Sequence, residues 1–108
     1  MFDIFRGAKK RAIDEFGHKL AEDFMQGFPL DEHKGGGDAK STRKLTRVVD
    51  VICGDARRFH FENKLDIYGK ARLNNTLMWH LREAGYEESF VNDITKRVII
   101  SLSQRQQA

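Results

Sequence analysis

Apolar residues recur with helical spacing in four stretches of this chain, and polar or glycine-containing segments separate them. In residues 2–27 the apolar positions fall on one arc of a helix and charged residues fall opposite. The pattern stops at Gly27, before Phe28 and Pro29, because the residue preceding proline is disfavoured in a helix. The apolar arc of this first predicted helix comprises Phe2, Phe5, Ala12, Ile13, Phe16, Leu20 and Phe24.

Two further stretches give equally regular helical patterns. Residues 41–60 predict a helix that Ser41 or Thr42 caps, with a buried face from Leu45 to Phe59. The last helix is predicted to start at the acids Glu87 and Glu88, which suit the first turn of a helix, and to run through Leu102. Residues 98–100 are β-branched and also fit a short strand, but the surrounding helical period favours a helix.

The stretch from Leu65 to Gly85 is apolar on two opposite sides when it is read as a helix. Leu73, Leu77 and Leu81 share one side, whereas Tyr68, Arg72, Asn75 and Trp79 share the other. Such a helix either lies buried in the middle of a bundle or packs on its own domain with one side and on a partner with the other. Gly85 followed by Tyr86 predicts a left-handed stop with an apolar residue packing back.

These elements predict an all-α fold, a small bundle of about four helices with a flexible loop after the first helix. The 108 residues are enough for one domain only. We divide the domain into an amphipathic helix over 1–28, a loop over 29–41 and a three-helix core over 42–105. The loop is predicted from its three consecutive glycines and its lack of hydrophobic periodicity.

The charge of the chain is concentrated in one helix. Residues 40–58 carry six basic and two acidic side chains, a balance of +4 in a chain whose total is +3. A helix side rich in arginine can follow a phosphate backbone, although Asp50 and Asp55 lie among these bases and the same pattern suits a solvated surface. The candidate nucleic-acid-binding residues are Arg43, Lys44, Arg47, Arg57 and Arg58.

No sequence motif indicates an enzyme. The four histidines lack metal-ligand spacing, so we expect no metal site and no cofactor. Cys53 lies on the apolar side of its helix and is interpreted as a small buried hydrophobe. A single cysteine cannot form an internal disulfide, and the N-terminus lacks the apolar core of a secretory signal, so we expect a cytoplasmic protein without a transmembrane segment.

The leading functional hypothesis is a non-enzymatic helical interaction module that binds a protein partner or forms a homodimer. Tyr, Trp and Arg are the residue types enriched at binding hot spots, so the candidate partner-binding residues are Tyr68, Arg72 and Trp79. The alternative is a weakly sequence-specific nucleic-acid-binding protein that uses the basic helix. If four or five of its bases met phosphates, the slope of log affinity against log salt would be about −4 on duplex DNA.

Overall fold

The computed structural model describes residues 2–35 and 37–103, and the side chains of 9–35 and 37–103. Five helices follow one another in this part of the chain: α1 Phe2–Gly27, α2 Leu30–Lys34, α3 Ala39–Asn63, α4 Ile67–Glu83 and α5 Glu88–Ser103. The described residues contain no strand, and residues 98–100 are helical. The all-α prediction is therefore confirmed. The side chains of Phe2 and Phe5 lie outside the described ones.

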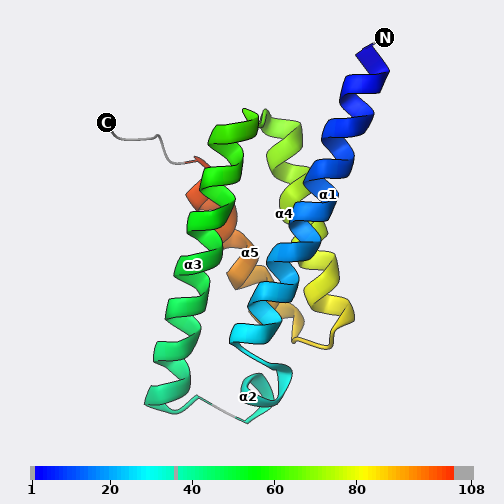
Figure 1. Ribbon diagram of the computed structural model, residues 1–108. Helices are drawn as coiled ribbons and strands as arrows, with labels where there is room; N and C mark the ends of the chain where they lie inside the picture. Colours follow the sequence, from blue (N-terminus) through cyan, green and yellow to red (C-terminus); the bar gives the residue numbers. More distant parts are fainter. Residues whose placement is uncertain (1, 36, 104–108) are drawn as a thin grey trace, which may run out of the picture.

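The four long helices form a bundle around one core (Figure 1). α1 packs against α3 and α4, and α5 packs against the same two helices from the other side. Figure 1 shows α1 and α4 running in the same direction, with α3 and α5 running in the opposite one. The core contains fully buried side chains from all four long helices, among them Leu20 and Phe24 of α1, Ile52 of α3, Leu77 of α4 and Val98 of α5.

The segment predicted to be a flexible loop is partly helical. α2 occupies five of its residues at one end of the bundle, and it begins directly after Pro29 (Figure 1). The His33 ring lies 4.2 Å from the Phe90 ring between centroids, and His33 Nε2 accepts a hydrogen bond from the Glu87 amide at 3.1 Å. These contacts tie α2 to the start of α5, which the polar, aperiodic sequence of this segment did not indicate.

The predicted ends of α3 are wrong by a few residues at each side. Asp38, rather than Ser41 or Thr42, is the N-cap, and its Oδ1 accepts a hydrogen bond from the Ser41 amide at 2.7 Å. At the other end the helix continues through Asn63 and stops at Lys64, which adopts a left-handed conformation with φ 50°. In the extra turn, backbone N–H and C=O groups form helical hydrogen bonds that they would lack if a loop began at residue 60.

Both ends of α4 have identifiable caps. Asp66 is the N-cap, and its Oδ1 accepts a hydrogen bond from the Gly69 amide at 2.7 Å, so Gly69 lies within the first turn. The predicted stop is confirmed, since Gly85 has φ 105° and Tyr86 is buried. The Tyr86 amide donates to the Leu81 carbonyl at 3.3 Å, as in a Schellman motif.

Close packing of α1 on α4 depends on Gly17. A Cβ atom at this position would lie 2.8 Å from Thr76 Cγ2 and 2.9 Å from Thr76 Cβ. We expect Gly17→Ala to lower the free energy of unfolding by about 1 kcal/mol, because the cost of overpacking exceeds the helix propensity that alanine adds. Urea unfolding measures this change.

The matched control for this prediction is Gly54→Ala in the middle of α3. Beyond its own residue, the two chain neighbours and the adjacent backbone of α3, a Cβ atom at that position would meet no atom within 4 Å. We expect Gly54→Ala to raise the free energy of unfolding by about 0.5–1 kcal/mol, from helix propensity alone. Equal effects of the two substitutions would contradict the close contact between α1 and α4.

Candidate protein-interaction surface

The two apolar sides of α4 have opposite environments. Leu73, Leu77 and Leu81 are completely buried in the core. On the other side Tyr68 is 58% exposed and Trp79 is 63% exposed. The first of the two arrangements considered from the sequence, a central helix buried on both sides, is therefore wrong. The second stripe of α4 faces outward.

We call this surface the α4 outer face. It forms a shallow, open hollow of about 500 Å³ along the edge between α4 and α1, and Asp14 of α1 and His80 also contribute to its lining. Its aromatic residues are 11 positions apart, which is roughly 16 Å along a helix. The α4 outer face comprises Tyr68, Ala71, Arg72, Asn75, Thr76 and Trp79.

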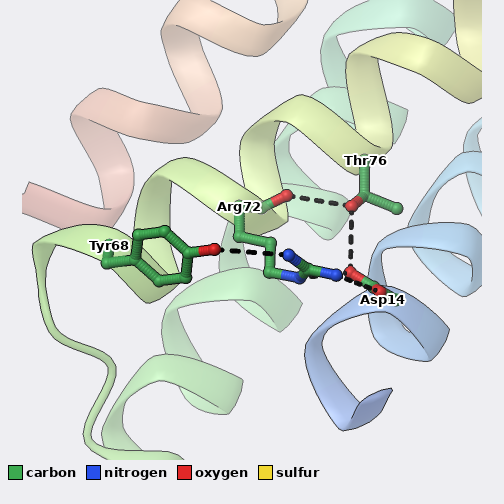
Figure 2. A network of polar contacts seen from close by, with 4 residues as sticks. All are labelled: Asp14, Tyr68, Arg72 and Thr76. Carbon is green, nitrogen blue, oxygen red and sulfur yellow. Dashed lines mark hydrogen bonds and ion pairs between the residues drawn. The ribbon is translucent and has the colours of Figure 1, made fainter. Parts of the chain in front are cut away.

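An ion pair between two helices holds Arg72 in the middle of this face. Arg72 Nε donates to Asp14 Oδ1 at 2.8 Å and Nη2 donates to Asp14 Oδ2 at 2.7 Å, a bidentate arrangement (Figure 2). Arg72 Nη1 also donates to the Tyr68 hydroxyl oxygen at 3.4 Å. Thr76 Oγ1 donates to the Arg72 carbonyl at 2.9 Å and lies 3.4 Å from Asp14 Oδ1. The network fixes the Arg72 side chain beside the exposed Tyr68 ring.

The ion pair shifts the pKa values of both its members. The hydrogen bonds from Arg72 are the main cause of the lowered pKa of the Asp14 carboxyl, against a smaller opposing effect of burial. The hydrogen bond to Asp14 likewise raises the pKa of Arg72. Both groups therefore remain charged at neutral pH, and the pair is a fixed feature of the surface.

The lowered pKa of Asp14 predicts a pH-dependent contribution to stability. The contribution is fully present above the ordinary carboxyl value of 3.8 and is lost as the pH falls through the lowered pKa. Because the Asp14 side chain is 42% exposed, we expect it to be worth less than about 1 kcal/mol. Urea unfolding of the wild type and of Asp14→Asn at pH 6 and pH 2.5 measures it.

The wild type should lose more stability between these two pH values than Asp14→Asn does. Asp23→Asn is the matched control, since Asp23 makes a single ion pair with Lys19 within one helix at 3.1 Å. We expect Asp23→Asn to keep nearly the whole pH dependence of the wild type. A pH dependence that Asp14→Asn leaves unchanged would show that the Asp14–Arg72 pair does not stabilise the fold.

Two histidines meet at the Trp79 end of the face. The rings of His18 in α1 and His80 in α4 lie 4.5 Å apart between centroids in an edge-to-face arrangement. His18 also contacts Glu22 one turn further along α1. No group of three or more His, Cys, Asp or Glu side chains within the described ranges is placed to hold a metal ion.

The basic residues of α3 divide into two groups. Arg43, Lys44 and Arg47 line one hollow together with Lys40. Arg57 and Arg58 lie ten residues or more further along the helix than Arg47, at least roughly 15 Å away. Lys44 forms an ion pair with Glu32 of α2. The structure therefore brings three of the five candidate nucleic-acid-binding residues together, one of them already paired.

The other basic group lies close to acids and to α5. Arg58 Nη1 is 3.7 Å from Asp55 Oδ1.

The pKa of the Cys53 thiol is raised, mainly by burial and further by the negative charge of Asp50. The positive charges of Arg57 and Arg97 oppose this effect, but they do not outweigh it. Cys53 packs against the core but is only half-buried, less than its interpretation as a small buried hydrophobe implied. None of the helices in the described part of the chain is both long and apolar enough to cross a membrane.

Asp14 is the residue of this site that the sequence pattern did not single out. It falls among the polar residues of the first helix, and it lies 58 positions from Arg72. No local pattern connects two residues so far apart in the chain.

Comparisons with protein-family models, curated proteins and solved structures found no match to this chain.

Proposed function

We propose that the protein is a non-enzymatic interaction module that binds another protein chain through the α4 outer face. The exposure of Tyr68 and Trp79 on one side of a helix whose other side is completely buried carries this proposal. Two aromatic rings on one helix face expose apolar surface to water, and a bound protein would cover that surface. Tyr, Trp and Arg are also the residue types that dominate binding energy.

The fixed position of Arg72 supports the same conclusion. An arginine that is already held by a bidentate ion pair loses little side-chain entropy when a partner covers it. Its Asp14 partner keeps the charge neutralised, so burial of the pair does not leave an isolated charge. The face thus combines two apolar anchors with a preorganised polar centre.

Photo-crosslinking tests the proposal. A benzophenone amino acid replaces Asn75, in the middle of the α4 outer face, and in a control protein it replaces Asn92, which is exposed on α5. Both proteins are irradiated in purified form and in extract of the native cells. We expect discrete protein adducts from position 75, lost when Trp79→Ala is added, and none from position 92. Equal adducts from both positions, or none from position 75, would contradict the proposal.

A second candidate function is binding of nucleic acid by the basic hollow of α3. Its support is the clustering of Lys40, Arg43, Lys44 and Arg47 around one hollow. Because Lys44 is paired with Glu32, three side chains remain to neutralise phosphates. We then expect a slope of log affinity against log salt of about −3 on duplex DNA, shallower than the sequence alone implied.

Fluorescence anisotropy of labelled random duplex DNA at several salt concentrations measures this slope. The double substitution Arg43→Glu with Arg47→Glu should abolish binding, whereas Lys96→Glu on α5 should leave it unchanged. No binding at low salt, or a slope near zero, would remove this function.

A further inference from the structure

The residues of the α4 outer face have the spacing of a single stripe along a helix, which reads the same from either end. Counting from either end gives the same intervals of three, one, three, one and three positions. Reversal exchanges Tyr68 with Trp79, Ala71 with Thr76, and Arg72 with Asn75. Such a stripe can meet a copy of itself in antiparallel orientation, because in a two-fold interface each contact of residue i with residue j is repeated as j with i.

We infer that the α4 outer face binds a second copy of this chain, with the two α4 helices antiparallel and Tyr68 of each copy against Trp79 of the other. The inference rests on the proposed function and specifies the partner. The aromatic rings at the two ends then cover each other, and the short side chains of Ala71, Asn75 and Thr76 leave room near the middle beside Arg72, which its ion pair holds toward Asp14. Arg72 then faces the Asn75 amide of the second copy.

The charges at the two ends of the face are complementary in this arrangement. Lys10 of α1 lies beside Tyr68, with its Nζ 5.8 Å from the centroid of the ring. Glu83 lies one helical turn beyond Trp79 and is exposed. Glu83 follows Trp79 by four residues and therefore lies on the same side of α4, roughly 6 Å further along the helix. In the antiparallel register Trp79 meets Tyr68 of the second copy, so Glu83 lies about one helical turn from the level of Lys10 of that copy, a distance that the long lysine and glutamate side chains can span.

The two-fold axis also brings these charges to the same side of the interface. The axis passes between the two α4 helices, perpendicular to both and within the contact plane, so the α1 helices of the two copies flank the same edge. Lys10 of one copy and Glu83 of the other therefore meet twice, once at each end. A parallel arrangement would instead place both Lys10 residues at one end of the interface and both Glu83 residues at the other.

The size of the contact predicts a weak dimer. α4 has 17 residues and is therefore about 25 Å long. One helix from each copy, with the adjoining edge of α1, is at the small end of specific interfaces, so we expect a dissociation constant in the micromolar range. The dimer should form and dissociate reversibly within an accessible concentration range.

Charge reversal combined with sedimentation equilibrium tests the register. The wild type, Lys10→Glu, Glu83→Lys and the double variant are measured between about 1 and 300 μM, a range that brackets the expected constant. Each single reversal should weaken the dimer about tenfold, because two-fold symmetry repeats the lost contact and places like charges together. The double variant should restore the dimer to within about threefold of the wild type.

Two results would overturn the inference. One is a mass that stays at the 12.5 kDa of a single chain over the whole range. The other is a dimer that the double variant weakens as much as, or more than, either single variant. Both results leave the proposed function standing, because the crosslinking outcomes at positions 75 and 92 test that function independently of the mass of the protein. Lys10 and Glu83 are both exposed, so their replacement should not disturb the fold. Circular dichroism checks that each variant keeps its helices.

Discussion

Replacing Phe24 by alanine is expected to lower the free energy of unfolding by about 3–5 kcal/mol. The Phe24 side chain is completely buried in the core. Its ring lies 5.7 Å from that of Tyr86, 6.0 Å from that of Phe90 and 6.1 Å from that of Phe28, between centroids. Truncation removes contacts with both the start of α5 and the residue that leads into α2. The surrounding rings are themselves held in place, so the cavity cannot close fully.

Urea unfolding followed by circular dichroism measures this loss. A domain of this size has a total stability of roughly 5–15 kcal/mol, so the variant should be only marginally folded. Tyr68→Ala is the matched control, because it removes an aromatic ring that is 58% exposed. We expect the control to change stability by less than about 0.5 kcal/mol. Similar losses for the two variants would place Tyr68 in the core and remove the basis of the proposed surface.

Replacing Trp79 by alanine is expected to raise the dissociation constant for binding through the α4 outer face about thirtyfold. This factor corresponds to the loss of about 2 kcal/mol of binding free energy at a hot spot. Trp79 is the largest side chain of the α4 outer face and is 63% exposed in the free chain. It stands at one end of the face and Tyr68 stands at the other, where the Tyr68 hydroxyl oxygen accepts a hydrogen bond from Arg72. The fold should be unaffected, with a change in unfolding free energy below about 0.5 kcal/mol.

Val51→Ala is the matched control for Trp79→Ala. Val51 is an exposed apolar residue on α3, 55% accessible, and it does not belong to the α4 outer face. Association of each variant is measured by sedimentation and by the yield of the crosslink from position 75. We expect Val51→Ala to match the wild type in both measurements. A variant lacking Trp79 that associates as well as the wild type would exclude this face as the contact surface.

The helical pattern predicted the fold well because the buried side of each helix repeats at regular intervals. Leu73, Leu77 and Leu81 were assigned to one side of their helix, and all three are completely buried. Helix ends were less predictable, since several residues compete for each cap. Asp38 caps α3 although Ser41 and Thr42 follow closely and have equally suitable side chains.

The candidate surface was only partly predictable. The sequence contained the second stripe of α4, but it did not decide whether that stripe was covered. The answer depends on how many helices surround α4, which is a property of the whole bundle. Asp14 and Arg72 illustrate the same point, because their pairing follows from the parallel packing of α1 against α4 rather than from any local pattern.

The solvent exposure of Trp79 during association tests the central claim most directly. Trp79 is the only tryptophan of the chain, so its fluorescence reports on the α4 outer face alone. Acrylamide quenching is measured over a dilution series, with light scattering on the same samples to give the mass. We predict that quenching decreases and the emission shifts to shorter wavelength as the mass doubles. A mass that doubles while Trp79 remains as readily quenched as in the dilute protein would contradict the account.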